Sequence, residues 1–330
     1  AGFLNFNSQQ VSLDLASLEQ AILKLNLRGP DFQNCESVSE QVGLAHARLS
    51  IIDTSNEANQ PMHAYGERYT IIFNGEIYNY LELKQQLEKE KGEVFFTASD
   101  TEVILRMYHH HGKDCLRFFN GFFALAIHDK ESDELFIARD RMGIKPLIYT
   151  KTDTSVYFAS EMKAMMAFNI KREIDFVSLQ QYFQFNYIPS PSTIFKNVHK
   201  LKPGHFLSID KTGNIKEEQY YTIPKTTTYL NLNYEEAQKE LRDILDLSVQ
   251  RRLVADVPLG SFLSGGIDSS IIATIASKHK KNLNTFSIGF KDSPYFDETA
   301  YANLVAKKIK SNHTVFSLSN DDLYESLNDI

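Results

Sequence analysis

One heptapeptide, SGGIDSS at positions 264–270, restricts what this chain can fold into more than any other stretch. The apolar run 257–263 before it predicts a strand, and the residues after it predict a helix that begins near Ser270. Two adjacent glycines let the backbone approach a ligand closely, and the outward N–H groups of such a turn form a cradle for an anion. A carboxylate in the same turn, Asp268, makes sense beside phosphates if it holds a hard cation such as Mg²⁺. The heptapeptide therefore predicts a pyrophosphate-binding loop with its own metal ligand.

No lysine follows the two glycines, so the loop is not the GxxxxGK[ST] type that binds a transferable γ-phosphate. A second apolar run, TFSIGF at 285–290, lies one helix length further on and predicts a neighbouring strand. A β–α–β unit of this kind has its ligand crevice at the carboxyl ends of its strands. From the residues alone, a glycine-rich turn without a ligand stays open as the alternative.

The first resemblance to a known family lies in this region. The segments VPLGSFL, SGGIDSS and TFSIGF, with FDE at 296–298, resemble the synthetase half of glutamine-dependent asparagine synthetases. The resemblance implies an α/β parallel-sheet ATP-pyrophosphatase domain that cleaves ATP between its α- and β-phosphates and adenylates a carboxylate. It implies ATP and Mg²⁺ as cofactors, with Asp268 as the Mg²⁺ ligand. Carried over by motif, the ATP-binding residues are Leu263, Ser264, Gly265, Gly266, Asp268, Ser269, Ser270, Ile288 and Gly289.

Composition excludes several classes of protein. The formal net charge of −7 argues against a nonspecific nucleic-acid surface, which needs an excess of lysine and arginine. No apolar run approaches the length of a membrane span, and no signal peptide is recognisable. The two cysteines, Cys35 and Cys115, imply no disulfide framework. We therefore expect a cytoplasmic enzyme that acts on small molecules and binds neither nucleic acid nor a membrane.

The length of 330 residues leaves room for two domains, each with its own core. The one shift in composition lies between 211 and 233, where Lys, Thr, Gly, Asn and Pro224 interrupt the apolar rhythm. We predict domains at 1–212 and 233–330, joined by a linker at 213–232. Asn233 and Glu236 form a capping-box pattern, which predicts the first helix of the second domain.

The front domain alternates strand-like runs with helical stretches, which predicts an α+β fold of stacked sheets covered by helices. Its polar groups suited to an amino-acid ligand are Arg48 in RLSIID, the NGE of FNGEIYN, and Asp100 in SDTE. An arginine can fork onto an α-carboxylate, and Glu76 and Asp100 can bind an α-ammonium. Asn74 and the N–H of Gly75 can donate to a developing oxyanion. The alternative is that the carboxylates are solvated turn residues, with Asp100 as a helix N-cap.

A second resemblance covers the front domain and is to class II glutamine amidotransferases. It rests on strings that occur in the family's order: RGPD, RLSIID, FNGEIYNY, SDTE, NGFFALAI, ARDRMGIKPL and SEMKA. It implies the four-layer αββα fold of the N-terminal-nucleophile hydrolases. By motif, Arg48, Asn74, Glu76 and Asp100 bind glutamine, and Asn74 and Gly75 form the oxyanion hole.

The two ends of the chain depart from the family pattern. Family members begin with Cys-Gly-Ile after methionine removal, whereas this chain begins with AGFL, which resembles the residues normally found after that tripeptide. The terminal cysteine supplies its own α-amine as general base, so we expect it to precede Ala1. We expect Cys35 and Cys115 to be structural. The family's synthetase domain continues past Ile330, so we expect 233–330 to be its N-terminal part, a truncated domain.

Together the resemblances predict a carbon–nitrogen ligase that hydrolyses glutamine to ammonia and uses ATP to amidate a carboxylate. Aspartate is the expected acceptor, which would give asparagine. Two alternatives stay open: an acceptor such as a sugar uronate in surface-polysaccharide synthesis, and a β-lactam-synthetase-like enzyme with an inactive glutaminase domain. The complete glutamine-binding set argues against the second. The resemblance also implies a homodimer.

Overall fold

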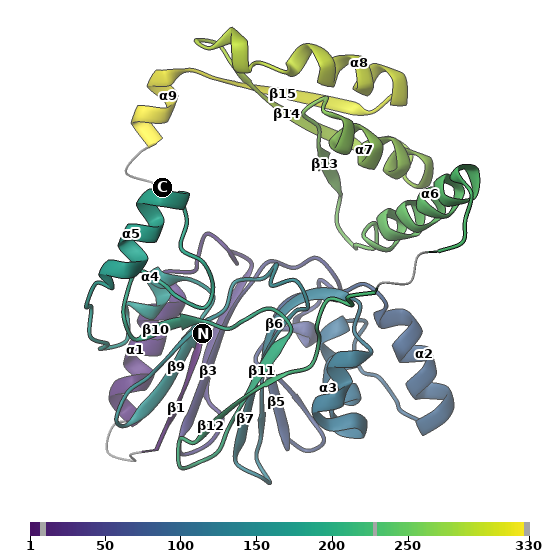
Figure 1. Cartoon of the computed structure of the whole chain (residues 1–330). Helices are drawn as coiled ribbons and strands as arrows, with labels where there is room; N and C mark the ends of the chain where they lie inside the picture. The colour runs from purple at the N-terminus through teal and green to yellow at the C-terminus, as the bar shows by residue number, and fades with distance from the viewer. Residues whose placement is uncertain (7–10, 227–229, 327–330) are drawn as a thin grey trace. The chain divides into compact units, whose positions relative to one another are not determined.

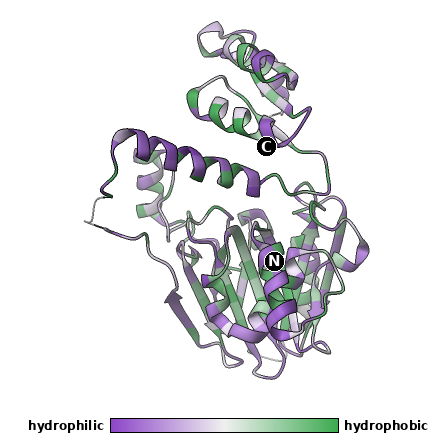
Figure 2. Cartoon of the chain, turned by 90° about the vertical axis from the view of Figure 1, so that its right-hand side faces the viewer, coloured by the Kyte–Doolittle hydropathy of each residue, from purple (hydrophilic) through white to green (hydrophobic). Residues whose placement is uncertain are grey.

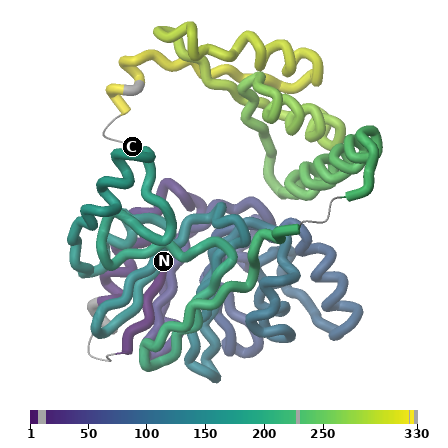
Figure 3. Tube along the Cα trace, in the orientation of Figure 1, coloured from purple at the N-terminus to yellow at the C-terminus, as the bar shows by residue number. Residues whose placement is uncertain are grey.

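The computed structural model describes residues 1–6, 11–226 and 230–326. The chain divides into two compact units, Ala1–Lys225 and Thr226–Ile330 (Figure 3). No helix in the described ranges is long and apolar enough to cross a membrane.

The first unit contains two six-stranded sheets in which every neighbouring pair is antiparallel. The first sheet has the order β10 (Val198–Lys200), β8 (Ile148–Lys151), β9 (Ser155–Ala159), β1 (Gly2–Asn5), β3 (Val42–Arg48), β2 (Phe32–Ser37). The second has the order β12 (Ile215–Gln219), β11 (His205–Ile209), β7 (Glu134–Arg139), β6 (Gly121–Asp129), β5 (Tyr69–Ile77), β4 (Met62–Ala64).

Helices cover the outer faces of both sheets (Figure 1). Helices α1 (Val11–Leu23) and α4 (Met162–Met165) contact the first sheet, and α3 (Asp100–His111) contacts the second beside α2 (Tyr80–Lys91). Successive strand residues point to opposite faces. Accordingly, Leu44 of β3 joins the core between the sheets, while Ala45 joins the core under α1 and α4. These layers confirm the predicted αββα arrangement. Helix α5 (Phe176–Phe185) follows α4 in the chain.

The second unit contains a parallel sheet in the order β13 (Gly260–Phe262), β14 (Asn284–Phe290), β15 (Asn312–Leu318). Its helices are α6 (Tyr234–Arg251), α7 (Ile267–His279), α8 (Thr299–Ile309) and α9 (Asn320–Glu325). The predicted capping box is present, because Asn233 and Glu236 exchange hydrogen bonds at the start of α6. Along α6, polar residues are interrupted by apolar ones (Figure 2). The parallel α/β fold predicted for this part of the chain is confirmed.

Three boundaries differ from the sequence-based expectation. Strand β12 lies inside the predicted linker 213–232, where Ile215 pairs with Ile209 of β11 and packs against the core between the sheets. The strand expected at 257–263 is shorter, because pairing with β14 spans only Gly260–Phe262. The helix expected near Ser270 begins at Ile267, because Gly265, at φ 87°, completes the turn in fewer residues.

Candidate active site and nucleotide loop

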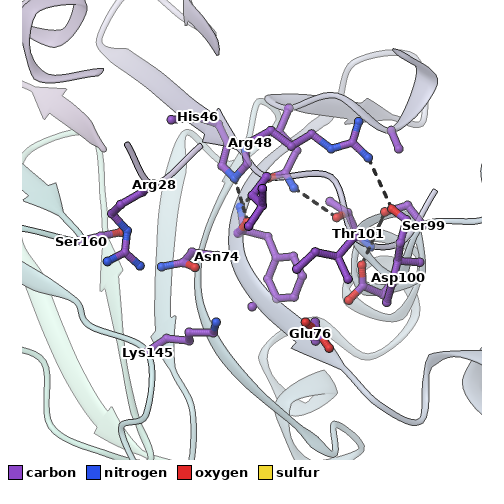
Figure 4. A pocket seen from close by; sticks show the side chains of 18 of the residues that line it. Arg28, His46, Arg48, Asn74, Glu76, Ser99, Asp100, Thr101, Lys145 and Ser160 are labelled. Carbon is purple, nitrogen blue, oxygen red and sulfur yellow. Dashed lines mark hydrogen bonds between the residues drawn. The ribbon is translucent and has the colours of Figure 1, made fainter. Parts of the chain in front are cut away.

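A cavity of about 220 Å³ in the first unit brings together all five residues predicted to handle glutamine. Arg48 lies at the end of β3, Asn74, Gly75 and Glu76 lie in β5, and Asp100 begins α3. Figure 4 shows Glu76 and Asp100 at one end of the cavity, with Arg28 and Lys145 at the other. The cavity therefore offers carboxylates and cations to one ligand, as a zwitterionic amino acid requires.

Asp100 is a buried carboxyl group, with 5% of its surface exposed. Its Oδ2 accepts a hydrogen bond of 3.0 Å from the N–H of Ile77, so it links α3 to β5. The helix N-cap is Ser99, whose hydroxyl accepts from the N–H of Thr101, so the alternative that Asp100 is the N-cap is wrong. Burial raises the pKa of Asp100 to about 7, and the nearby Glu76 adds to the rise. A bound ammonium group would favour its ionised form.

The guanidinium of Arg48 is buried and holds the chain that follows β3. Its Nη1 donates to the carbonyl of Ser55 (2.9 Å) and to Oδ1 of Asn59 (2.8 Å). Its Nη2 donates to the carbonyls of Ile52 (3.4 Å) and Asp53. Arg48 therefore brings a positive charge to the cavity and also fixes the turn that forms part of the cavity wall.

Gly75 is required by the close approach of two strands. A Cβ atom at this position would lie 2.2 Å from the carbonyl oxygen of Phe122 and 2.8 Å from the Cα of Phe123. Both atoms belong to the backbone of β6, so a side chain would force β5 and β6 apart. The glycine thus keeps Asn74 and Glu76 on a paired strand at the edge of the cavity.

The predicted phosphate loop joins β13 to α7. Gly265 has φ 87°, and a Cβ atom there would lie 2.5 Å from the Cβ of Tyr301 on α8. The hydroxyl of Ser264 lies 3.0 Å from that of Ser269 and accepts a hydrogen bond from the N–H of Gly266 (3.3 Å). Asp268 lies exposed in the first turn of α7. The loop therefore presents a helix N-terminus, two hydroxyls and one carboxylate at the surface of the unit.

The remaining predicted ATP-binding residues lie beside this loop. The N–H of Leu263 donates to the carbonyl of Phe286 (2.8 Å), and the hydroxyl of Ser287 donates to the carbonyl of Leu263. These bonds hold the start of the loop against β14, the strand that carries Ile288 and Gly289. Leu263 itself is fully buried in a small core, and the hydroxyl oxygen of Ser270 is buried without a hydrogen-bond partner among the described residues.

Family models match both parts of the chain. Residues 1–221 match the family described as Glutamine amidotransferase domain, and residues 240–330 match the family described as Asparagine synthase. The first match covers more than half of the chain, so the chain belongs to the glutamine amidotransferase domain family.

Curated proteins named as glutamine-hydrolysing asparagine synthetases are similar over most of the chain. Asparagine synthetase [glutamine-hydrolyzing] 1 of Bacillus subtilis is 41% identical over 89% of this chain and 46% of that protein. Putative asparagine synthetase [glutamine-hydrolyzing] 2 of Methanocaldococcus jannaschii is 34% identical over 98% of this chain and 65% of that protein. The chain thus spans about half to two thirds of the length of these relatives.

Among solved structures, a glutamine phosphoribosylpyrophosphate amidotransferase of B. subtilis, complexed with ADP and GMP, is similar to this chain with a TM-score of 0.43. The sequences are 17% identical, and the match covers 86% of this chain and 78% of that one.

The cavity of this family member contains residues that the sequence analysis did not assign. His46 on β3 donates from Nε2 to the carbonyl of Phe73 on β5 (3.0 Å), and its Nδ1 is buried without a partner among the described residues. Burial lowers the pKa of His46 to about 3, so the ring is neutral. The other unassigned polar lining residues are Arg28, Gln60, Ser99, Thr101, Lys145 and Ser160. Arg28, Lys145 and Ser160 lie in the strings RGPD, ARDRMGIKPL and SEMKA. These strings could have indicated from the sequence that the three residues belong to the cavity.

The two internal cysteines lie outside the residues that line this cavity. Both thiols are free; Cys115 is buried and Cys35 is half-buried. Burial raises the pKa of Cys35 to about 11 and raises that of Cys115 further. Neither thiol is ionised near neutral pH, so neither is suited to act as a nucleophile.

The donors around Asp268 fit a magnesium ion only if the ion also binds a nucleotide. The described residues contain no group of three or more His, Cys, Asp or Glu side chains that could hold a metal. In nucleotide sites, Mg²⁺ takes one or two carboxylates and completes its shell with phosphate oxygens and water. The single exposed carboxylate of Asp268 fits that donor set.

Proposed function

We propose that the protein hydrolyses glutamine in its first unit and uses ATP in its second unit to amidate a carboxylate, with aspartate as the acceptor. One observation carries the proposal. Groups of both charges suited to the backbone of an amino acid, and donors suited to an oxyanion, line a single cavity: Arg48, Asn74, Gly75, Glu76 and Asp100. The similarity to proteins named as glutamine-hydrolysing asparagine synthetases supports it, together with the match of 240–330 to the family described as Asparagine synthase.

In the first unit, the α-ammonium of glutamine would lie against Glu76 and Asp100, and the charge of Arg48 would attract its α-carboxylate. Asn74 and the N–H of Gly75 would donate to the oxyanion formed when the side-chain amide is attacked. Ala1 lines the cavity just before β1, and its carbonyl accepts from the N–H of Ala45 (2.9 Å). A cysteine ahead of Ala1 would supply the thiol, which forms a thioester and releases ammonia.

In the second unit, the loop at 264–270 would bind the ATP phosphates, and Asp268 would hold Mg²⁺. The ion would neutralise phosphate charge when the acceptor carboxylate attacks the α-phosphate. Pyrophosphate leaves, and ammonia then displaces AMP from the acyl-adenylate. Ile288 and Gly289 would contact the nucleoside. The proposal extends, through the family resemblance, to a homodimer in the cytoplasm.

The test uses the complete natural protein, assayed for glutamate and for pyrophosphate. The proposal predicts glutamate release from glutamine, and pyrophosphate release that requires aspartate together with glutamine or ammonia. Pyrophosphate release with a sugar uronate but not with aspartate would show that the acceptor is the uronate. Aspartate-dependent pyrophosphate release with ammonia, but no glutamate release, would show an inactive glutaminase. Release of neither product would overturn the proposal.

A further inference from the structure

Two segments that are distant in sequence form adjoining parts of the glutamine cavity wall. The first follows β3 and includes Ile52 and Asp53; the second leads into α3 and includes Ala98 and Ser99. The first segment carries the acceptors that hold Arg48, and the second ends at Asp100. Their relative position therefore sets the spacing between the groups assigned to the α-carboxylate and to the α-ammonium of glutamine.

The carboxylate of Asp53 joins these two segments. Its Oδ1 accepts from the N–H of Ser55 (3.1 Å) and from the hydroxyl of Ser55 (2.5 Å). Its Oδ2 accepts from the N–H of Ala98 (2.7 Å), which is 45 residues away in sequence. Burial alone would raise the pKa of Asp53, but the hydrogen bonds from Ser55 and Ala98 outweigh burial and lower it. The carboxylate of Asp53 is thus ionised near neutral pH and accepts hydrogen bonds from both segments.

The backbone of Asp53 contributes to the same arrangement. Its carbonyl accepts from Nη2 of Arg48, while the carbonyl of Ser55 accepts from Nη1 (2.9 Å). The residue has φ 53°, in the left-handed region that asparagine and aspartate tolerate better than most residues. Asp53 therefore orients the guanidinium of Arg48 with its backbone carbonyl. Its side chain holds the segment that leads to Asp100.

The far end of the second segment has its own anchor. Glu102 on α3 accepts from the N–H groups of Phe96 (3.0 Å) and Thr97 (2.7 Å). The segment is consequently fixed to α3 at 96–97 and to the Asp53 turn at 98. Loss of the Asp53 bond would leave the Glu102 anchor in place, so it would loosen one side of the cavity without unfolding the segment.

We propose that Asp53 is a positioning residue for glutamine, because its carboxylate fixes the turn that holds Arg48 against the segment that presents Asp100. The inference rests on the proposed glutaminase function of this cavity. A displacement of about 1 Å in a positioned group can cost about 100-fold in rate or affinity. The loss of one partly exposed hydrogen bond costs far less in stability.

The test is Asp53→Asn in the complete natural protein. Asparagine keeps the size of the side chain and tolerates φ 53°, but it offers one oxygen and one NH₂ group to donors on both sides. With a single oxygen on the side chain, the N–H of either Ser55 or Ala98 must lose its acceptor. We expect the KM for glutamine to rise about 10-fold, with kcat and ammonia-dependent synthesis unchanged. We also expect faster amide hydrogen exchange at Ser55 or at Ala98, whichever N–H loses its acceptor.

A matched control is Asp210→Asn in the turn between β11 and β12. Asp210 accepts from the N–H (2.8 Å) and the hydroxyl (2.6 Å) of Thr212, much as Asp53 accepts from Ser55, but it lies in neither of the two wall segments of the cavity. The Asp210→Asn substitution should leave the KM for glutamine unchanged.

The possible results separate this inference from the function on which it rests. A wild-type protein that releases no glutamate would refute the proposed function, whatever the variant does. An active wild type with an unchanged KM in Asp53→Asn would overturn the positioning role. Equal losses of glutamine- and ammonia-dependent synthesis would also overturn it, because they would indicate a general structural defect. Unchanged amide exchange at both Ser55 and Ala98 would refute the link itself, with or without activity.

Discussion

The first unit buries apolar residues on both faces of its first sheet, whereas in the second unit the described residues cover only one face of the sheet. In the second unit, the register places Phe262, Ile288 and Phe316 on one face, with 80%, 49% and 55% of their surfaces exposed among the described residues. The opposite face carries Thr285 and Ser287, which are buried. A continuous core thus fixes the glutamine cavity, while strand ends and a glycine turn fix the phosphate loop. Substitutions in the cavity and substitutions in the phosphate loop should therefore impair the protein in different ways.

The largest effect is expected for Asp100→Asn in the glutamine cavity. Asparagine can still accept from the N–H of Ile77, so the link between α3 and β5 is retained. It removes a buried negative charge from the proposed ammonium site, which should cost about 100-fold or more in kcat/KM for glutamine. Ammonia-dependent synthesis should not change. Both rates are measured on the same preparation, and an equal loss of the two would show that the units do not divide the work as proposed.

The second effect concerns the loop of the second unit. Gly265→Ala introduces a Cβ atom 2.5 Å from the Cβ of Tyr301 and 2.6 Å from the N of Ala302, at φ 87°. Such strain should cost about 1–3 kcal/mol and move the loop away from α8. Pyrophosphate release should fall sharply while glutamate release is retained.

Gly266→Ala separates packing against α8 from contact with a ligand in the same loop. Its Cβ atom would meet only the hydroxyl of Ser264, at 3.3 Å, and its φ of −66° suits any residue. A thermal melt and a pyrophosphate assay of both variants make the comparison. If Gly266→Ala were as harmful as Gly265→Ala, contact with a ligand rather than packing against α8 would explain the need for glycine.

The third effect is a pH dependence confined to the first unit. The pKa of Asp100 is raised to about 7, mainly by burial, and a bound ammonium requires its ionised form. The KM for glutamine should therefore rise as the pH falls below about 7, by up to about 10-fold per pH unit. Pyrophosphate release at saturating ammonia should lack this step, and Asp100→Asn should abolish it. A step that persists in Asp100→Asn would assign it to another group.

The smallest effect is expected for Ser287→Ala. The substitution removes the donor to the carbonyl of Leu263 at the start of the loop, which should destabilise the second unit by about 1 kcal/mol. Ser277→Ala, which removes an exposed hydroxyl that donates to the carbonyl of Thr274 (2.8 Å), should cost less than about 0.5 kcal/mol. Denaturant unfolding of both variants measures the difference. Equal midpoints would show that the Ser287 bond does not stabilise the unit.

The residues alone left open whether Arg48, the NGE segment and Asp100 meet, and the resemblance to class II glutamine amidotransferases predicted that they do; all of them line one cavity of the first unit. Asn74 to Glu76 share a strand, and SDTE marks the start of a helix. The β–α–β order around SGGIDSS was predictable because a glycine turn between an apolar run and a helix has few alternatives.

Other features depend on pairings that no local pattern reveals. The acceptors of Arg48 lie up to 11 residues further along the chain, in a turn whose path is set by the long-range bond from Ala98 to Asp53. The hydrogen bond of His46 reaches a strand of the other sheet. Strand β12 was assigned to the linker because its sequence, IKEEQ, contains a single apolar residue in a polar stretch, and only its pairing with β11 reveals it.

The most direct test of the central claim is a crystal structure of the complete natural protein with glutamate, the product of glutamine hydrolysis. The proposal predicts glutamate in the cavity of the first unit, with its α-ammonium within hydrogen-bond distance of Glu76 and Asp100 and its α-carboxylate near Arg48. Glutamate bound with its α-ammonium away from both carboxylates, or bound outside this cavity, would contradict it.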